Sequence, residues 1–176
     1  MILNFINNKQ CCGCGACKEI CPRKAIKMEE DSEGFLQPVL ETDLCINCGI
    51  CDNVCPIKNT HKTTNNIISS FAAINKDVPT LKKSSSGGLF SVIAEYIIKN
   101  GGIVYGASFD KNLKLSHKGI KQTQELECLR GSKYLQSNSF DCFPLIKKQL
   151  QNNQLVYFVG TGCQVAALKL YPKERI

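Results

Sequence analysis

Cysteines dominate the chemistry that this sequence could perform. The chain has 12 cysteines among its 176 residues, and eight of them fall into two runs that share the spacing C-x2-C-x2-C-x3-C-P, at residues 11–22 and 45–56. Each cysteine of the second run lies 34 residues after its counterpart in the first. Thiolates are soft ligands, so the pattern indicates iron–sulfur clusters or zinc. The constant offset indicates an internal repeat of one half-module.

The spacing of both runs is typical of bacterial ferredoxins, where the fourth cysteine of each run binds the cluster held mainly by the other run. Glycines inside the runs let the backbone approach a cluster. The alternatives are a disulfide scaffold or a zinc site, but zinc would leave four of the eight cysteines without a role. The predicted ligands are Cys11, Cys14, Cys17 and Cys55 for one [4Fe-4S] cluster, and Cys45, Cys48, Cys51 and Cys21 for the second.

Charge is unevenly distributed along the chain. Residues 1–60 carry 6 Lys and Arg against 8 Asp and Glu, whereas residues 61–176 carry 16 against 7, giving a net charge of +7. This asymmetry predicts an acidic electron carrier joined to a basic domain, which could hold nucleotide phosphates or dock an acidic redox protein. The lysines are scattered without interleaved aromatic residues, which argues against nucleic acid.

The cysteine content and the N-terminus bear on the compartment. Residues 1–9 have neither a basic start nor a long apolar core, so they do not resemble a signal peptide. No apolar stretch is long enough to cross a bilayer. Free cysteines then indicate a reducing compartment, and we expect a soluble, cytoplasmic protein.

The elements that must position this chemistry follow from apolar patterning and turn residues. A hairpin is expected between the cysteine runs, followed by a polar linker that includes His61. Beyond the linker, strands and helices should alternate, and His117 falls on a strand, where we expect it to be solvated. The expected elements are a hairpin over 25–40, strands at 71–75, 103–109, 113–117 and 155–160, and helices at 89–99, 123–126 and 141–150, with residues 89, 93, 96 and 97 forming the apolar face of the first helix.

Three turns of the second domain are rich in groups that bind anions. A Ser/Gly run at 84–88 precedes a helix, Arg130 and Lys133 bracket Gly131-Ser132, and the turn 161–164 follows a strand and opens a helix. Helix N-termini present unpaired N–H groups and positive potential to an anion. The last turn also places Cys163 where a thiolate is favoured, which makes it a candidate nucleophile. The remaining cysteines, Cys12, Cys128 and Cys142, are expected to pack as small apolar residues.

Several ordered segments resemble one known family. Residues 85–91, 101–107, 129–137 and 160–166 are similar to signature segments of the coenzyme F-420 hydrogenase/dehydrogenase beta-subunit family. The resemblance runs from about Phe71 to the C-terminus. It implies a flavoprotein that binds FAD, exchanges hydride with coenzyme F-420 and passes single electrons through iron–sulfur clusters. The flavin contacts that it implies are Ser86, Gly87, Gly88, Gly131, Ser132, Lys133, Tyr134, Gly160, Thr161, Cys163 and Gln164.

Together these features predict an α+β protein with a ferredoxin-type 2[4Fe-4S] module followed by the N-terminal part of an α/β flavin-binding domain. The expected divisions are a ferredoxin domain at 1–60, a linker at 61–70, the family's N-terminal domain at 71–153 and an incomplete C-terminal domain at 154–176. Members of the family continue further, so we expect a fragment, from a truncated reading frame or a split gene. They also usually have proline where this chain has Gly162.

The functional prediction is an iron–sulfur flavoprotein oxidoreductase subunit that receives electrons from a ferredoxin or a partner subunit. The alternative from another class is a non-enzymatic electron carrier whose second domain docks a partner and holds no flavin. A third possibility is that Cys163 acts as a thiol nucleophile in disulfide or substrate reduction.

Overall fold

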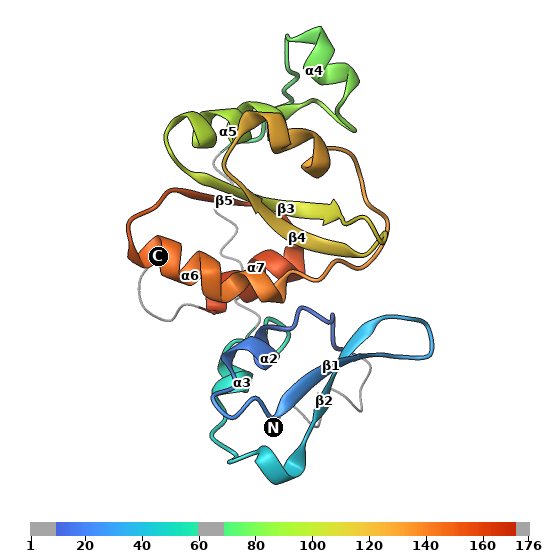
Figure 1. Ribbon diagram of the computed structural model, residues 1–176, viewed down its shortest axis with the longest axis vertical. Helices are drawn as coiled ribbons and strands as arrows, with labels where there is room; N and C mark the ends of the chain where they lie inside the picture. Colours follow the sequence, from blue (N-terminus) through green and yellow to red (C-terminus); the bar gives the residue numbers. More distant parts are fainter. Residues whose placement is uncertain (1–9, 60–68, 172–176) are drawn as a thin grey trace.

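The computed structural model describes residues 10–59 and 69–171, which form two modules stacked along the long axis of the molecule (Figure 1). The first module carries both cysteine runs, and the second is built on a three-stranded sheet. Four expectations concern residues outside this description: the N-terminal segment 1–9, most of the linker, His61, and the chain beyond residue 171.

The first module contains one antiparallel hairpin and two short helices. Strands β1 (Ile26–Glu30) and β2 (Leu36–Leu40) pair with Ile26 opposite Leu40, which confirms the predicted hairpin between the cysteine runs. Helix α2 (Ala16–Ile20) lies within the first run and helix α3 (Ile50–Asn53) within the second. A 3-10 helix, Thr42–Leu44, leads into the second run.

The two cysteine runs share one backbone conformation. Gly15 and Gly49 precede α2 and α3 with φ angles of 69° and 72°. Two residues earlier in each run, Gly13 and Asn47 also have positive φ angles, of 64° and 53°. Asparagine is one of the few residues that tolerate this left-handed region. The internal repeat inferred from the sequence is therefore also a repeat of local structure.

The sheet of the second module has the strand order β4-β3-β5. Strands β3 (Ile103–Phe109) and β4 (Leu115–Ile120) form an antiparallel hairpin, as predicted. Strand β5 (Val156–Phe158) runs parallel to β3, with Ile103 opposite Val156. The carboxyl ends of two parallel strands therefore lie at the same edge of the sheet, which is where open α/β sheets bind ligands.

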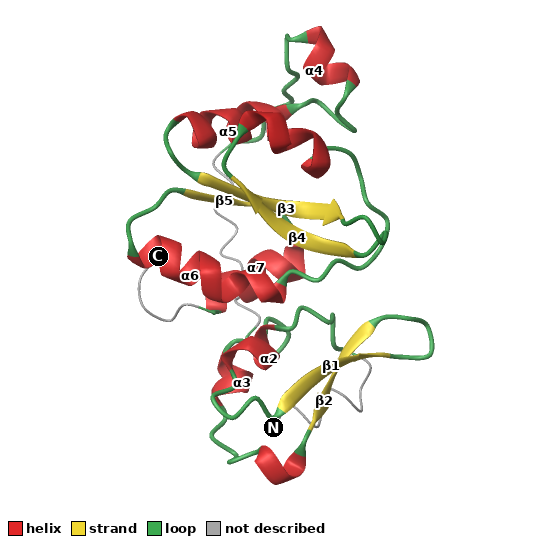
Figure 2. Ribbon diagram, in the orientation of Figure 1, coloured by secondary structure: helices red, strands yellow, loops and turns green. Residues whose placement is uncertain are grey.

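Helices cover both faces of this sheet (Figure 2). Successive residues of β3 alternate between two cores: Val104 packs on the side of α5, whereas Ile103 and Tyr105 pack on the side of α6 and α7. The second side faces the first module, and α4 projects from the opposite end of the molecule. The helices are α4 (Val78–Lys82), α5 (Leu89–Lys99), the 3-10 helix η2 (Thr123–Leu129), the 3-10 helix η3 (Phe140–Cys142), α6 (Phe143–Gln151) and α7 (Gly162–Leu170).

One apolar core joins the two modules. Cys14, Ala16 and Val54 of the first module pack in the same cluster as Phe140 and Phe143 of the second. A hydrogen bond also joins the two modules: the Leu36 backbone N–H donates to Gln136 Oε1 at 2.6 Å. The first cysteine run is therefore built against the second module.

Two predicted features of the second module are wrong. Residues 71–75 form an irregular segment, and Phe71 is 89% exposed. The Asn75 backbone N–H donates to Gly87 O, so the segment packs beside the Ser/Gly loop. An apolar segment becomes a strand only where a neighbouring strand pairs with it, and its composition does not show whether one does. The predicted apolar face of α5 is also mostly exposed.

Small residues explain the true orientation of α5. The helix buries Ser91, Ala94 and Ile97, whereas Ile93 and Tyr96 face solvent. The small side chains of Ser91 and Ala94, which are three residues apart, let the helix approach β3 closely. The predicted residues Leu89, Ile93 and Tyr96 lie on the exposed face, and Ile97 alone of the four is buried.

Candidate functional site

The four cysteines predicted for the first cluster line one cavity. Cys11, Cys14 and Cys17 come from the loop and first turn of α2, and Cys55 follows α3, so the two runs cross over. Met28 from β1 and other apolar residues complete the wall. This is the arrangement that the ferredoxin spacing requires, with three sulfurs from one run and the fourth from the other.

The second set of cysteines lines a separate cavity of about 240 Å³. Cys45, Cys48 and Cys51 are joined there by Cys21, and every lining residue belongs to the first module. Cys48 is exposed, whereas Cys14 of the first cavity is buried in the core shared with the second module. The structure thus gives the two sites different surroundings, one enclosed between the modules and one open to solvent.

The donor sets suit iron–sulfur clusters. Each cavity offers four thiols, and all 12 cysteines of the chain are free. Burial raises the pKa of Cys11, and it raises the pKa of Cys17 to about 12. Cluster binding must therefore displace protons from these thiols. Within residues 10–59 and 69–171, no three His, Cys, Asp or Glu side chains converge closely enough to hold a single metal ion.

The second module contains a cavity of about 580 Å³ on which all three anion-type turns converge. This volume lies within the range of small-molecule sites. Gly106 and Ala107 of β3 and Val159, which follows β5, line it, so the cavity opens at the carboxyl edge of the parallel strands. Of the residues predicted to contact flavin, nine line this cavity: Ser86, Gly87, Gly88, Gly131, Ser132, Lys133, Gly160, Thr161 and Gln164.

The remaining two predicted residues lie elsewhere. Tyr134 is 92% exposed and lines a different cavity, between the β1–β2 hairpin and the second module. Cys163 does not line the 580 Å³ cavity, although its neighbours Thr161 and Gln164 do. Its thiol lies beside Thr161 Oγ1 at 3.1 Å.

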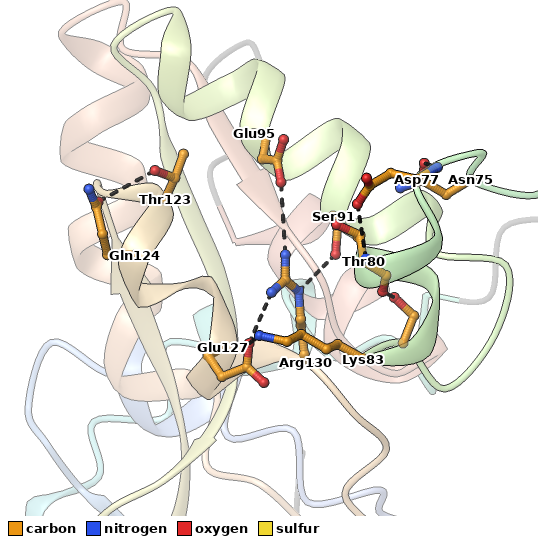
Figure 3. Close-up of polar contacts among 11 residues, drawn as sticks. Asn75, Asp77, Thr80, Lys83, Ser91, Glu95, Thr123, Gln124, Glu127 and Arg130 are labelled. Atoms are coloured by element: carbon orange, nitrogen blue, oxygen red, sulfur yellow. Dashed lines mark hydrogen bonds and ion pairs between the residues drawn. The ribbon is translucent and has the colours of Figure 1, made fainter.

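Arg130 serves as a structural cation in the cavity wall (Figure 3). Its Nε donates to Ser91 Oγ at 3.0 Å, and its two terminal nitrogens lie 3.0 Å from Glu127 and 3.8 Å from Glu95. The side chain is 13% exposed. These contacts tie η2 to α5 and neutralise the guanidinium, so Arg130 positions the Gly131-Ser132 turn rather than offering a free charge.

Lys133 supplies positive charge to the cavity more directly. Its Nζ donates to the Arg130 carbonyl at 2.6 Å, and among the described residues it forms no ion pair with a carboxylate. Burial lowers its pKa. An anion bound in the cavity would give this partly buried ammonium a counter-charge.

The N-terminus of α7 is shaped by a capping box. Thr161 is the N-cap, and Gln164 Oε1 accepts from the Thr161 backbone N–H at 2.9 Å. Gln164 Nε2 also donates to Ser137 O at 3.1 Å, which fixes the turn against a neighbouring segment. The predicted strand–turn–helix is confirmed, and its first turn faces the cavity.

His117 is the cavity residue that sequence reasoning missed. It was expected to be solvated, but its ring lines the cavity and stacks on Phe158 with centroids 5.0 Å apart. Nε2 lies 2.9 Å from Val159 O, so it carries the proton, because a carbonyl can only accept. Nδ1 is buried without a partner, and burial lowers the pKa of the ring. Strand alternation was the available signal, since Leu115 lines the same cavity two residues earlier.

The other two cysteines are small packed residues, as predicted. Cys142 is buried and donates to Ser139 O at 2.8 Å, while Cys128 donates to Glu125 O at 3.0 Å. Both thiols are therefore satisfied locally by backbone carbonyls. Neither lines the 580 Å³ cavity.

Comparison with known proteins identifies the first module. A search of curated proteins found no match to the chain. Within the two described segments, helices are too short or too polar to cross a membrane. Residues 10–59 match the family model described as a 4Fe-4S dicluster domain. This part of the chain is therefore a 4Fe-4S dicluster domain, and its chemistry is iron–sulfur electron transfer.

Proposed function

We propose that the chain is an iron–sulfur flavoprotein subunit that passes electrons between two [4Fe-4S] clusters and an FAD in the 580 Å³ cavity. The observation that carries this proposal is that three turns, which lie far apart in the sequence, line one cavity at the carboxyl edge of parallel strands. The site is polar at these turns and apolar at Phe90, Leu115 and Leu129, which suits a ligand with a flat ring and phosphates.

Each part of the cavity has a task in this proposal. The N-termini of α5 and α7 and the Gly131-Ser132 turn bind phosphate through backbone N–H groups. Lys133 adds a charge, and Arg130 holds its turn in place. A bound flavin supplies the exchange between one-electron and two-electron transfer. The two-electron partner, by family resemblance, is coenzyme F-420 or a similar deazaflavin.

The two clusters have different positions along this path. The first cluster site shares a core with the second module, because Cys14 lies in that core and Cys12 packs against it. The second site is lined by the first module alone and has an exposed ligand, Cys48. In this proposal the second site, with its exposed ligand, would receive electrons from a redox partner, and the first would pass them toward the second module. A redox protein or partner subunit is the expected donor.

Iron and flavin analysis of the full chain tests the proposal. The protein is purified and reconstituted without oxygen, and bound iron and extracted flavin are measured per chain. We expect about eight iron atoms, the content of two [4Fe-4S] clusters, with stoichiometric FAD. Full iron without retained flavin, after incubation with excess FAD, would instead support the electron carrier.

A matched lysine pair tests the location of the flavin. Lys133→Ala removes the cation of the cavity wall and should weaken FAD binding about tenfold or more, the loss of one charge-assisted contact. Lys111→Ala, in the exposed β3–β4 turn, is the control and should leave FAD binding unchanged. Binding is measured by quenching of flavin fluorescence. Equal affinities in the two variants would place the flavin elsewhere.

A further inference from the structure

His117 reaches across the central strand of the second module. The sheet order is β4-β3-β5, and His117 lies on β4 directly opposite Ala107 of β3. Its Nε2 nevertheless lies 2.9 Å from the carbonyl oxygen of Val159, which follows β5. Paired residues share one face of a sheet, so the ring crosses over the small side chain of Ala107, which lines the same cavity. A side chain of β4 therefore contacts the backbone beyond β5.

This contact completes the anchoring of Val159. The Val159 backbone N–H donates to Tyr105 O of β3 at 2.9 Å, and the Val159 carbonyl accepts from His117. Stacking on Phe158, with ring centroids 5.0 Å apart, holds the imidazole in this orientation. Both backbone polar groups of Val159 are thus hydrogen-bonded to other strands, although the pairing of β3 with β5 ends one residue earlier, at Phe158.

The β5–α7 turn begins at the next residue. Gly160 and Thr161 line the 580 Å³ cavity, and the Gln164 side chain accepts from the Thr161 backbone N–H at 2.9 Å. His117 thus fixes the turn where it leaves the strand, and Gln164 fixes it where it enters the helix. Glycine has the widest range of backbone conformations, so without the anchor at Val159 the turn could move about Gly160.

The two nitrogens of the imidazole have unequal surroundings. Because Nε2 donates to Val159 O, Nδ1 of the neutral ring can only accept, and it is buried without a partner among the described residues. Such buried polar atoms are uncommon, since each costs the free energy of its desolvation. An apolar side chain of similar size at residue 117 would avoid that cost but would lose the bond to Val159. The bond to Val159 O is therefore the contact that an imidazole supplies at this position.

We propose that His117 is a positioning residue of the 580 Å³ cavity: through Val159 it holds the β5–α7 turn in the conformation that binds an anionic group of the ligand. The inference rests on the proposed function and deepens it, because it takes that group to be the pyrophosphate of FAD. The turn presents the N-terminus of α7 to the cavity, where unpaired N–H groups and the helix dipole favour negative charge. His117 acts on this end of the helix through the backbone, without touching the phosphates itself.

Hydrogen exchange of the full chain tests the anchoring without any ligand. His117→Leu keeps a side chain of similar bulk but has no donor for Val159 O, whereas His117→Gln keeps a donor. We expect the backbone N–H groups of residues 160–166 to exchange about fivefold faster in His117→Leu, the loss of about one hydrogen bond, and to return toward the wild-type rate in His117→Gln. Exchange is followed by mass spectrometry of peptides.

Two controls separate this local effect from a loss of overall stability. Lys118→Gln changes the next residue of β4, which is exposed and points to the opposite face of the sheet, and it should leave exchange unchanged. Peptides from the β1–β2 hairpin are the internal reference, and their exchange should be the same in every variant. Equal exchange of residues 160–166 in His117→Leu and the wild type would overturn the proposal, as would a rise of the same size in the hairpin.

Two probes then test what the turn binds. ADP carries a pyrophosphate group but lacks the flavin ring, and FAD carries both. His117→Leu should weaken binding of ADP and of FAD by the same factor, about fivefold, and His117→Gln should restore both. Calorimetry measures the affinities. ADP affinity that is unchanged in His117→Leu, or undetectable in the wild type, would overturn the proposal. Wild-type protein that binds ADP but not FAD would refute the flavin proposal and leave the His117 comparison intact, so the two failures are distinguishable.

Discussion

Matched glycines in the two cysteine runs have acquired different surroundings. Gly15 and Gly49 have the same left-handed backbone and each follows a predicted cluster ligand. A Cβ on Gly15 would lie 2.0 Å from the Phe140 ring, whereas a Cβ on Gly49 would meet no atom within 4 Å. Alanine would strain the left-handed backbone at both positions, but it would clash with a neighbouring side chain only at Gly15.

Alanine substitutions at these two positions therefore form a matched experiment. Gly49→Ala should cost about 1–2 kcal/mol, the penalty of the left-handed region for a residue with a Cβ. Gly15→Ala should cost more, with loss of the first cluster, because the ring of Phe140 is buried in the core that joins the modules. Denaturant unfolding and iron content measure the two effects. Equal destabilisation would contradict the packing at Phe140.

His117 predicts a pH dependence of stability. Its folded pKa is lowered by burial, so the unfolded chain takes up a proton first as the pH falls below the ordinary value of 6.5. Stability from this group is complete above that value and is lost as the pH falls toward the lowered pKa. His117→Gln keeps a donor for Val159 O but does not titrate. Its melting temperature should fall less than that of the wild type between neutral pH and about pH 5.5.

The orientation of α5 is a property of the whole element. Ile93 and Ile97 are four residues apart and chemically identical, yet Ile93 is 42% exposed and Ile97 is 9% exposed. The difference arises because Ser91 and Ala94 share the face of Ile97 and let the backbone approach the sheet.

Truncating each isoleucine tests which face is buried. Ile97→Ala should destabilise the protein by about 2–4 kcal/mol, since it opens a cavity against β3. Ile93→Ala should cost less than about 1 kcal/mol, as is usual for exposed positions. Thermal or denaturant unfolding of both variants gives the comparison. A larger loss from Ile93→Ala would mean that the exposed stripe is covered by another surface in solution.

At the scale of the whole molecule, the modules make the two clusters unequal. The first site lies against the second module, and the second site opens to solvent at Cys48. A chelator in solution reaches the open site first. Iron loss should therefore occur in two phases, with the second cluster removed in the faster phase.

Variants at the crossed ligands assign these phases. Cys21→Ala should remove the fast phase, because Cys21 lines the open cavity, and Cys55→Ala should remove the slow phase. Iron release to a coloured ferrous chelator, followed with time, measures both. Loss of the slow phase in Cys21→Ala would show that the runs do not exchange their fourth ligands.

Patterns among residues close in the sequence predicted much of this structure. The features that they missed depend on contacts between residues far apart in the sequence. The cysteine spacing, the hairpins and the capped helix after β5 depend on neighbours in sequence, and the structure contains them. The face of α5 and the course of residues 71–75 depend on which distant surface they meet, which composition does not encode. His117 was missed for the same reason, because its burial comes from Phe158 and Val159 on another strand.

The junction between Gly15 and Phe140 also has an evolutionary consequence. A duplicated half-module begins with two equivalent halves, and either could accept change at the residue that precedes its helix. Contact with a second domain ends that equivalence for one half. Among related sequences, the position of Gly49 should drift to asparagine or aspartate, which tolerate its backbone, while the position of Gly15 stays glycine wherever an aromatic ring occupies the place of Phe140.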